Sequence, residues 1–245
     1  MKKGLLIIGL LLIIGAIGYY INNNDQPHIQ DKEDKQVVDK TQDITYEELL
    51  SFINDFKCGD IINIENSNYL SSYVIPGRWK HSLIYVGTLT QMQSVYDDSN
   101  PYYQKLLKRY HQGDEILVID SNNTGVKIRE LKQMANLEDI SYLKAINVDR
   151  FNESNEFLSI YINTALNYLN TPYDFEMESY DDSKLYCSEL IYYSLLQVNY
   201  RIDQSTKILD VEVITPTNLV DYLESLDNIS RICLIEKIDN QLVRQ

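Results

Sequence analysis

Six short runs rich in β-branched residues, each bounded by Gly, Asn or Asp, constrain the fold of this chain more than any other feature of its sequence. The runs cover residues 59–65, 81–87, 115–120, 126–131, 142–148 and 231–238. Runs of this length and composition are typical of β-strands. The stretch "DSNNTG" between the third and fourth runs has the composition of a hairpin turn. We therefore expect an antiparallel-leaning sheet of about six strands.

Helical patterns precede, interrupt and follow these strands. They cover residues 46–56, 100–111, 155–170 and 215–226, and a further helix begins near Cys187. Thr45 and Glu48 form a capping-box pattern ahead of the first helix, and Thr215 can cap the last one. The segment 100–111 predicts a helix inserted between two strands, and it is a candidate lid over a site. Helices grouped before and after an antiparallel sheet indicate an α+β fold.

The N-terminus predicts a membrane segment. After Lys2 and Lys3, the run "GLLIIGLLLIIGAIGYYI" (residues 4–21) holds no charged side chain. As a helix this run spans roughly 27 Å, close to the ~30 Å hydrocarbon core of a bilayer. We expect residues 1–21 to be an uncleaved single-pass anchor. A secretory signal peptide is the alternative, although the run ends in tyrosines and not at a small-residue cleavage site. Either interpretation places the rest of the chain on the extracytoplasmic side of the cell membrane.

Residues 22–44 are polar and charged and predict a linker, which leaves residues 45–245 as one folded domain. The net charge is −14, and beyond residue 21 the chain has 20 basic against 36 acidic side chains. This balance argues against nucleic acid as a partner, and we expect a monomer. Three cysteines in an exported domain are too few for a disulfide framework, and their odd number leaves at least one thiol free.

The three cysteines differ in their surroundings. Cys233 alternates with apolar residues in a predicted strand and fits a buried hydrophobic role, whereas Cys58 is structural or forms a disulfide with Cys233. Cys187 is expected in the first turn of its helix, because the polar "DDSK" ahead of it cannot continue the apolar face. The free N–H groups and dipole of a helix N-terminus lower a thiol pKa and can support an oxyanion. Cys187 is therefore a candidate nucleophile, with a core cysteine as the alternative.

A thiolate nucleophile needs an imidazole base and an acceptor that orients the imidazole. His81 begins an apolar strand beside a loop, where a rigid element can hold a catalytic group, whereas His111 lies in a polar segment and is expected to be solvated. Asp120 ends another apolar strand and places a carboxylate at the sheet edge. An aspartate that caps the following turn is the alternative for Asp120. This chemistry needs no metal, and we expect no cofactor.

Seven segments resemble, in their order, the permuted papain-like hydrolases of the NlpC superfamily, in particular the YiiX/YebB-like amidases. They are "GDIINI", "HSLIYVG", "LVID", "GVKIREL", "TPYDF", "LYCSELIYYSL" and "ITPTNLV", between residues 59 and 220. The resemblance implies a circularly permuted papain-like fold. It also implies Cys187 as nucleophile, His81 as general base and Asp120 as the third residue, a position that varies in type across the superfamily. Tyr186 and the backbone N–H of Cys187 become oxyanion candidates.

Together with the predicted anchor, the resemblance implies a membrane-anchored extracytoplasmic cysteine hydrolase that cleaves an amide bond, peptide or isopeptide, through an acyl-enzyme. Its location and kinship favour cell-wall peptide as the substrate. The alternatives are a lipid acyl hydrolase or acyltransferase of the same superfamily, and a binding module that has lost turnover. Tyr173 and Asp174 would be structural or substrate-lining. Arg78 and Lys80, just before His81, would either draw an anionic group to the site or form a solvated surface pair.

Overall fold

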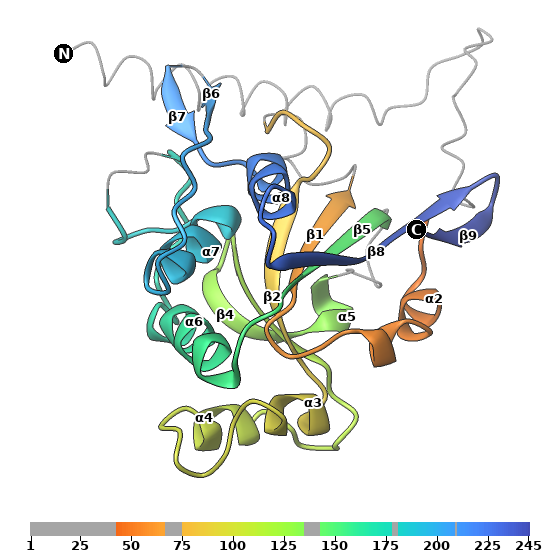
Figure 1. Cartoon of the computed structure of the whole chain (residues 1–245), viewed down its shortest axis with the longest axis vertical. Helices are drawn as coiled ribbons and strands as arrows, with labels where there is room; N and C mark the ends of the chain where they lie inside the picture. The colour runs from red at the N-terminus through yellow and green to blue at the C-terminus, as the bar shows by residue number, and fades with distance from the viewer. Residues whose placement is uncertain (1–42, 67–74, 135–142, 178–180, 209) are drawn as a thin grey trace, which may run out of the picture. The chain divides into compact units, whose positions relative to one another are not determined.

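The computed structural model describes residues 43–66, 75–134, 143–177, 181–208 and 210–245 (Figure 1). The predicted membrane segment and residues 22–42 of the predicted linker lie outside these ranges. Within them, the structure contains no helix whose length and hydropathy would suffice to cross a bilayer.

A seven-stranded antiparallel sheet organises the described domain (Figure 1). Its strand order is β4-β3-β2-β1-β5-β8-β9. The strands are β1 (Ile61–Asn66), β2 (His81–Gly87), β3 (Leu117–Asn122), β4 (Gly125–Glu130), β5 (Leu143–Phe151), β8 (Ile229–Ile238) and β9 (Gln241–Arg244). Each predicted run overlaps one of these strands, which confirms the α+β class. The sequence did not predict β9 or the separate ribbon of β6 (Thr206–Ile208) and β7 (Val211–Val213), because three or four residues give too short a pattern.

The five predicted helices are present with some changes of length, and the short helices α3 and α5 were not predicted. They are α2 (Tyr46–Leu50), α3 (Leu89–Gln93), α4 (Tyr103–Leu107), α5 (Leu131–Met134), α6 (Asn155–Asn167), α7 (Cys187–Leu196) and α8 (Pro216–Glu224). The capping box of Thr45 and Glu48 is present, and Thr215 caps α8. The first helix is nevertheless shorter than predicted, since it ends at Leu50 and a 3-10 turn, η2 (Ile53–Asp55), follows it.

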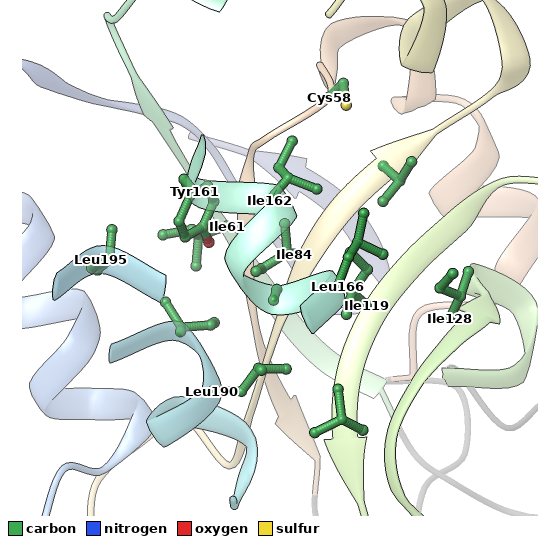
Figure 2. Packing of buried hydrophobic residues seen from close by; sticks show 14 of the residues in the cluster. Cys58, Ile61, Ile84, Ile119, Ile128, Tyr161, Ile162, Leu166, Leu190 and Leu195 are labelled. Carbon is green, nitrogen blue, oxygen red and sulfur yellow. The ribbon is translucent and has the colours of Figure 1, made fainter. Parts of the chain in front are cut away.

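One hydrophobic cluster fills the space between the sheet and helices α6 and α7. Ile61, Ile84 and Ile119 come from three neighbouring strands and are each fully buried. Figure 2 shows these side chains close to Leu166 of α6 and Leu190 of α7. The apolar residues predicted to face inward on α7 are thus buried against the sheet. This packing fixes α7, and with it the residue at its first position.

The opposite face of the sheet carries a second cluster. Ile62, Leu83 and Val118 alternate with the residues of the first cluster and pack against residues of the α2 region. Cys233 belongs to this second cluster, whereas Cys58 belongs to the first. Both thiols are free, so the alternative of a disulfide between them is wrong; the sheet separates the two residues.

The candidate lid lies at the far end of β2 from His81. Its helix, α4, begins at Tyr103, later than the sequence predicts, because the Asn100 side chain accepts the Tyr102 N–H in a local turn at 2.9 Å. The Tyr110 hydroxyl donates to the carbonyl of Gly87 at 2.9 Å, and Gly87 is the last residue of β2. His81 is the first residue of that strand, about 20 Å away at ~3.3 Å per residue. Helix α4 therefore does not cover His81.

Arg150 on β5 forms a two-pronged ion pair with the buried Asp60, with both N–O distances 2.7 Å. We expect Arg150→Met to lower the free energy of unfolding by about 3–5 kcal/mol, because Asp60 would stay buried without its partner. Urea denaturation followed by circular dichroism measures this change. Arg244→Met is the matched control, since its ion pair with Asp55 is about two-fifths exposed and should contribute less than about 1 kcal/mol. Equal losses in the two variants would contradict the prediction.

Candidate active site

The N-terminus of α7 is attached to β3 through the backbone of Leu185. The Leu185 N–H donates to the carbonyl of Pro172 at 2.9 Å, and its carbonyl accepts the Ser121 hydroxyl at 2.5 Å. Tyr186 is the N-cap, and Cys187 is the first helical residue, as the sequence predicts. Both backbone groups of Leu185 are thus held just before the helix begins. The bond to Ser121 ties the start of α7 to β3.

The β3–β4 hairpin contacts the segment that leads to α7. The N–H of Val126 donates to the carbonyl of Thr171 at 2.9 Å, so the segment before Pro172 crosses directly over the hairpin. Gly125 makes this crossing possible, since a Cβ at that position would lie 2.4 Å from the Thr171 carbonyl oxygen. Its φ of +82° also lies in the region that favours glycine.

His81 and Asp120 meet where strands β2 and β3 stop pairing. The β2–β3 ladder ends with Ile84 opposite Ile119, so residues His81 and Asp120 lie just beyond it. Their side chains face each other across this end, with His81 Nε2 and Asp120 Oδ2 3.1 Å apart. His81 is 7% exposed and Asp120 is fully buried. The structure therefore brings together the two residues that the sequence suggested as base and orienting acceptor.

Cys187 completes the cluster from the helix side. Its thiolate accepts hydrogen bonds from the His81 ring and from the backbone N–H groups of Ser82 and Ser188. Because His81 Nε2 faces Asp120, Nδ1 is the ring nitrogen left for Cys187. Ser82 is held in turn by its own hydroxyl, which donates to Asn63 Oδ1 at 2.6 Å. The strand therefore supplies both the imidazole and one N–H donor to the sulfur.

The charges of this cluster favour a thiolate–imidazolium pair. Burial alone would raise the pKa of Cys187, but the charge of His81 and the hydrogen bonds outweigh burial and lower that pKa. Burial alone would likewise lower the pKa of His81, but the charges of Cys187 and Asp120 outweigh it, and the pKa of His81 lies well above its usual value. The pKa of Cys187 falls and that of His81 rises for the same reason: each partner stabilises the charge of the other.

Arg129 is a member of the cluster that the sequence did not reveal. Its Nε donates to Asp120 Oδ1 at 2.6 Å, on the carboxylate oxygen that His81 does not use. The hairpin register places Lys127 opposite Asp120 and Arg129 two residues further on the same face. The sequence indicated the hairpin through its turn "DSNNTG". Arg129 could have been placed near Asp120 only from the strand register of that hairpin.

The remaining predicted residues lie around this cluster in different ways. The Tyr186 hydroxyl accepts the Ile214 N–H at 3.1 Å, and the side chain is buried, so this bond ties α7 to the segment before α8. Tyr173 is half-buried near Cys187: burial raises the pKa of its phenol, and the charge of Cys187 adds to that shift. Asp174 is buried and accepts the Glu176 N–H at 3.0 Å in a local turn.

The basic pair ahead of His81 is already engaged with protein groups. Arg78 donates to Glu65 at 2.6 Å and to Glu236 at 2.5 Å, and the Lys80 amine donates to the carbonyl of Ile75 at 2.7 Å. Two carboxylates thus balance the charge of Arg78. Both side chains are thus bound to protein groups, an arrangement that neither alternative from the sequence described.

A cysteine at a helix N-terminus, facing a strand histidine that a polar side chain holds through its other nitrogen, is the arrangement of papain-like cysteine hydrolases. In papain-like enzymes the cysteine comes first along the chain, whereas here it comes last, which a circular permutation explains.

The chain belongs to the permuted papain-like amidases of the YaeF/YiiX type, the C92 family, whose family model matches residues 55–221. A crystal structure of the metalloprotein yiiX from Escherichia coli O157:H7 is similar to it in fold, with 18% sequence identity and a TM-score of 0.50. The similarity covers 71% of this chain and 95% of that one. No curated protein matches the chain. The family confirms the resemblance drawn from the sequence and indicates a hydrolase of amide bonds.

The description of yiiX as a metalloprotein raises the question of a metal in this chain. Across the ranges that the structure describes, His, Cys, Asp and Glu side chains nowhere gather in threes so that they could hold an ion. No step of the chemistry below uses a metal.

Proposed function

We propose that this protein is an amide hydrolase in which Cys187 is the nucleophile, His81 the general base and Asp120 the residue that orients His81. The observation that carries the proposal is the series of contacts from Cys187 to His81 to Asp120. Asp120 accepts a hydrogen bond from Nε2, so Nδ1 is the ring nitrogen that takes the thiol proton. The family membership supports an amide as the bond that is cleaved.

The proposed reaction has two halves. The Cys187 thiolate attacks the amide carbonyl, and the developing oxyanion is stabilised by the backbone N–H of Cys187 at the start of α7. The His81 imidazolium gives its proton to the leaving amine, which departs and leaves a thioester on Cys187. His81 then takes a proton from a water molecule, the resulting hydroxide attacks the thioester, and the carboxylic acid is released. Tyr186 remains an oxyanion candidate only if its hydroxyl proton reaches the substrate from its position at Ile214.

The proposed substrate is a cell-wall peptide, cleaved outside the membrane by a domain anchored through residues 4–21. The apolar run and the polar linker of the sequence support this location. The linker of about twenty residues would keep the domain within about 25–30 Å of its anchor on average. Substrates at the membrane surface are therefore within reach.

A second candidate, hydrolysis of an acyl group from lipid, is favoured by one observation. Phe175 is 69% exposed, and its ring centroid lies 4.9 Å from that of Tyr173, which is close to Cys187. An exposed Phe175 ring packed on the half-buried Tyr173 can contact an apolar acyl group. The experiment must therefore offer both amide and lipid substrates.

The test begins with the pH dependence of iodoacetamide labelling at each cysteine of the full-length chain. We expect Cys187 to label with a midpoint below the ~8.5 of a free thiol, because its pKa is lowered. Cys58 and Cys233 are the internal controls: burial raises the pKa of Cys58, and it raises the pKa of Cys233 to about 11. A Cys187 that labels no faster than these two would contradict the proposed nucleophile.

The second part of the test identifies the product by mass spectrometry after incubation with purified cell-wall peptides or with lipid extracts. A new amine and carboxylate from peptide support the proposal, whereas a fatty acid supports the second candidate. A reactive Cys187 with binding of peptide but no product would indicate the binding-module alternative.

A further inference from the structure

Asp120 has two charged neighbours, and only one of them belongs to the proposed triad. Its Oδ2 faces His81 Nε2 at 3.1 Å, and its Oδ1 accepts from Arg129 Nε at 2.6 Å. Asp120 is fully buried, and the Arg129 side chain is 15% exposed. The Asp120 carboxylate thus contacts both His81, the proposed base, and the guanidinium of Arg129.

The guanidinium of Arg129 is held by the hairpin as well as by Asp120. Its Nη2 donates to Asn122 Oδ1 at 2.6 Å, to Thr124 Oγ1 at 3.0 Å and to the Gly125 carbonyl at 3.0 Å. These acceptors all lie in or beside the turn between β3 and β4. Because four bonds fix the planar group, its positive charge has one position relative to Asp120.

A cation fixed beside Asp120 weakens the stabilisation that Asp120 gives to the His81 imidazolium. A buried carboxylate alone would stabilise the imidazolium strongly, and His81 would then hold the proton that the leaving amine needs. Arg129 offsets part of the Asp120 charge on the side away from His81. It also holds the carboxylate in place, with Oδ2 toward His81 Nε2.

We infer that Arg129 is a positioning residue that sets the pH range of the Cys187–His81 pair, by counterbalancing the carboxylate that holds His81. This inference rests on the proposed function, since the pair matters only if Cys187 and His81 react. It goes beyond the triad because it assigns the acid–base behaviour of the site to a fourth residue on a different strand.

Other charged or titratable groups face this carboxylate less closely. Lys127 lies opposite Asp120 in the strand register, but its amine donates to Asn170 Oδ1 at 2.8 Å at the surface. Cys187 and Tyr173 face the cluster from the α7 side and from the segment before it, and Tyr173 stays neutral because burial raises its pKa. In the part of the chain that the structure describes, Arg129 is thus the cation other than His81 that directly contacts Asp120.

The experiment replaces Arg129 by Gln in the full-length chain. Loss of the cation stabilises the positive charge of His81 and destabilises the negative charge of Cys187, so both pKa values should rise. We expect the alkaline limb of the activity profile and the His81 titration, followed by NMR of ¹³C-labelled histidine rings, to move up by about one pH unit or more. The midpoint of Cys187 labelling should move in the same direction.

Two variants separate charge from structure. Lys127→Gln removes an equal charge from the same face of β4, but from an exposed position, and should leave the midpoints within a few tenths of a pH unit. Arg129→Lys keeps the charge but cannot keep all four bonds, and its midpoints should stay close to those of the unmodified protein. Circular dichroism reports folding, and Arg129→Met replaces Arg129→Gln if the latter does not fold.

The outcomes are distinct. Unchanged or lowered midpoints in folded Arg129→Gln would overturn the inference, and so would an equal shift in Arg129→Lys, because hydrogen bonds and not charge would then be the cause. An unreactive Cys187 in the unmodified protein would instead reject the proposed function. The His81 titration needs no turnover, so it tests the effect of Arg129 in either case.

Discussion

Cys187→Ala is expected to reduce kcat/KM for amide hydrolysis by about four orders of magnitude or more, because it removes the atom that forms the acyl-enzyme. The same change should alter the free energy of unfolding by only about 1 kcal/mol, since one small buried group is lost. Product release from the best substrate, measured with a large excess of enzyme, gives the residual rate.

Cys58→Ala and Cys233→Ala are the matched controls for Cys187→Ala. Both residues are buried thiols of the same size, and they lie in the hydrophobic clusters on the two faces of the sheet, away from His81. The two variants should have a lower free energy of unfolding than the unmodified protein, but a kcat/KM within a few-fold of its value. Retention of activity in Cys187→Ala would mean that another group performs the attack.

Asp120→Asn is expected to lower kcat by about 10³–10⁴-fold, although asparagine serves as the third residue in papain-like proteases. The reason is Arg129, which donates to Oδ1 of residue 120. An asparagine must keep its carbonyl oxygen toward Arg129, and its NH₂ group would then point at His81 Nε2. Nε2 would have to accept, the ring proton would move to Nδ1, and His81 could no longer take a proton from Cys187.

If Arg129 dictates how the amide at position 120 is oriented, removal of Arg129 should restore part of the activity lost in Asp120→Asn. A general loss of structure would not give this result. In Asp120→Asn/Arg129→Leu the amide is free to turn, so its oxygen can accept the Nε2 proton of His81. We expect the double variant to be more active than Asp120→Asn by at least about tenfold, measured at the pH optimum of each protein. Equal or lower activity, with both proteins folded by circular dichroism, would show that Arg129 does not dictate the orientation.

The elements that carry the site could be predicted from the sequence because their signals are local. The β-branched run 81–87 became β2 with unchanged bounds, and Cys187 is the first residue of α7 as the polar segment before it indicated. The capping residue Thr215 and Pro216 fixed the start of α8 in the same way. In each case the side chains that decide the boundary are within a few residues of it.

Other features depended on contacts that a single sequence does not show. The helix predicted over 46–56 stops at Leu50, and α3 has a capping box at Thr88 that lies within too short an apolar pattern to recognise. For Asp120 the local sequence indicated only a position at the sheet edge. Its contact with His81 joins residues that are 39 apart in sequence, and no local pattern shows it. Arg129 required the register of the hairpin as well as its existence.

His81 and Asp120 lie at one end of the paired part of β2 and β3. The connection that joins the two strands lies at the other end. The connection leaves β2 after Gly87 and returns at Leu117, and these two residues pair at the end of the ladder opposite His81 and Asp120. Changes in the length of this connection would therefore be absorbed at its exposed turns and would not move the base relative to its acceptor. A reporter domain inserted at an exposed turn between α3 and β3 is therefore expected to leave the contact between His81 and Asp120 unchanged.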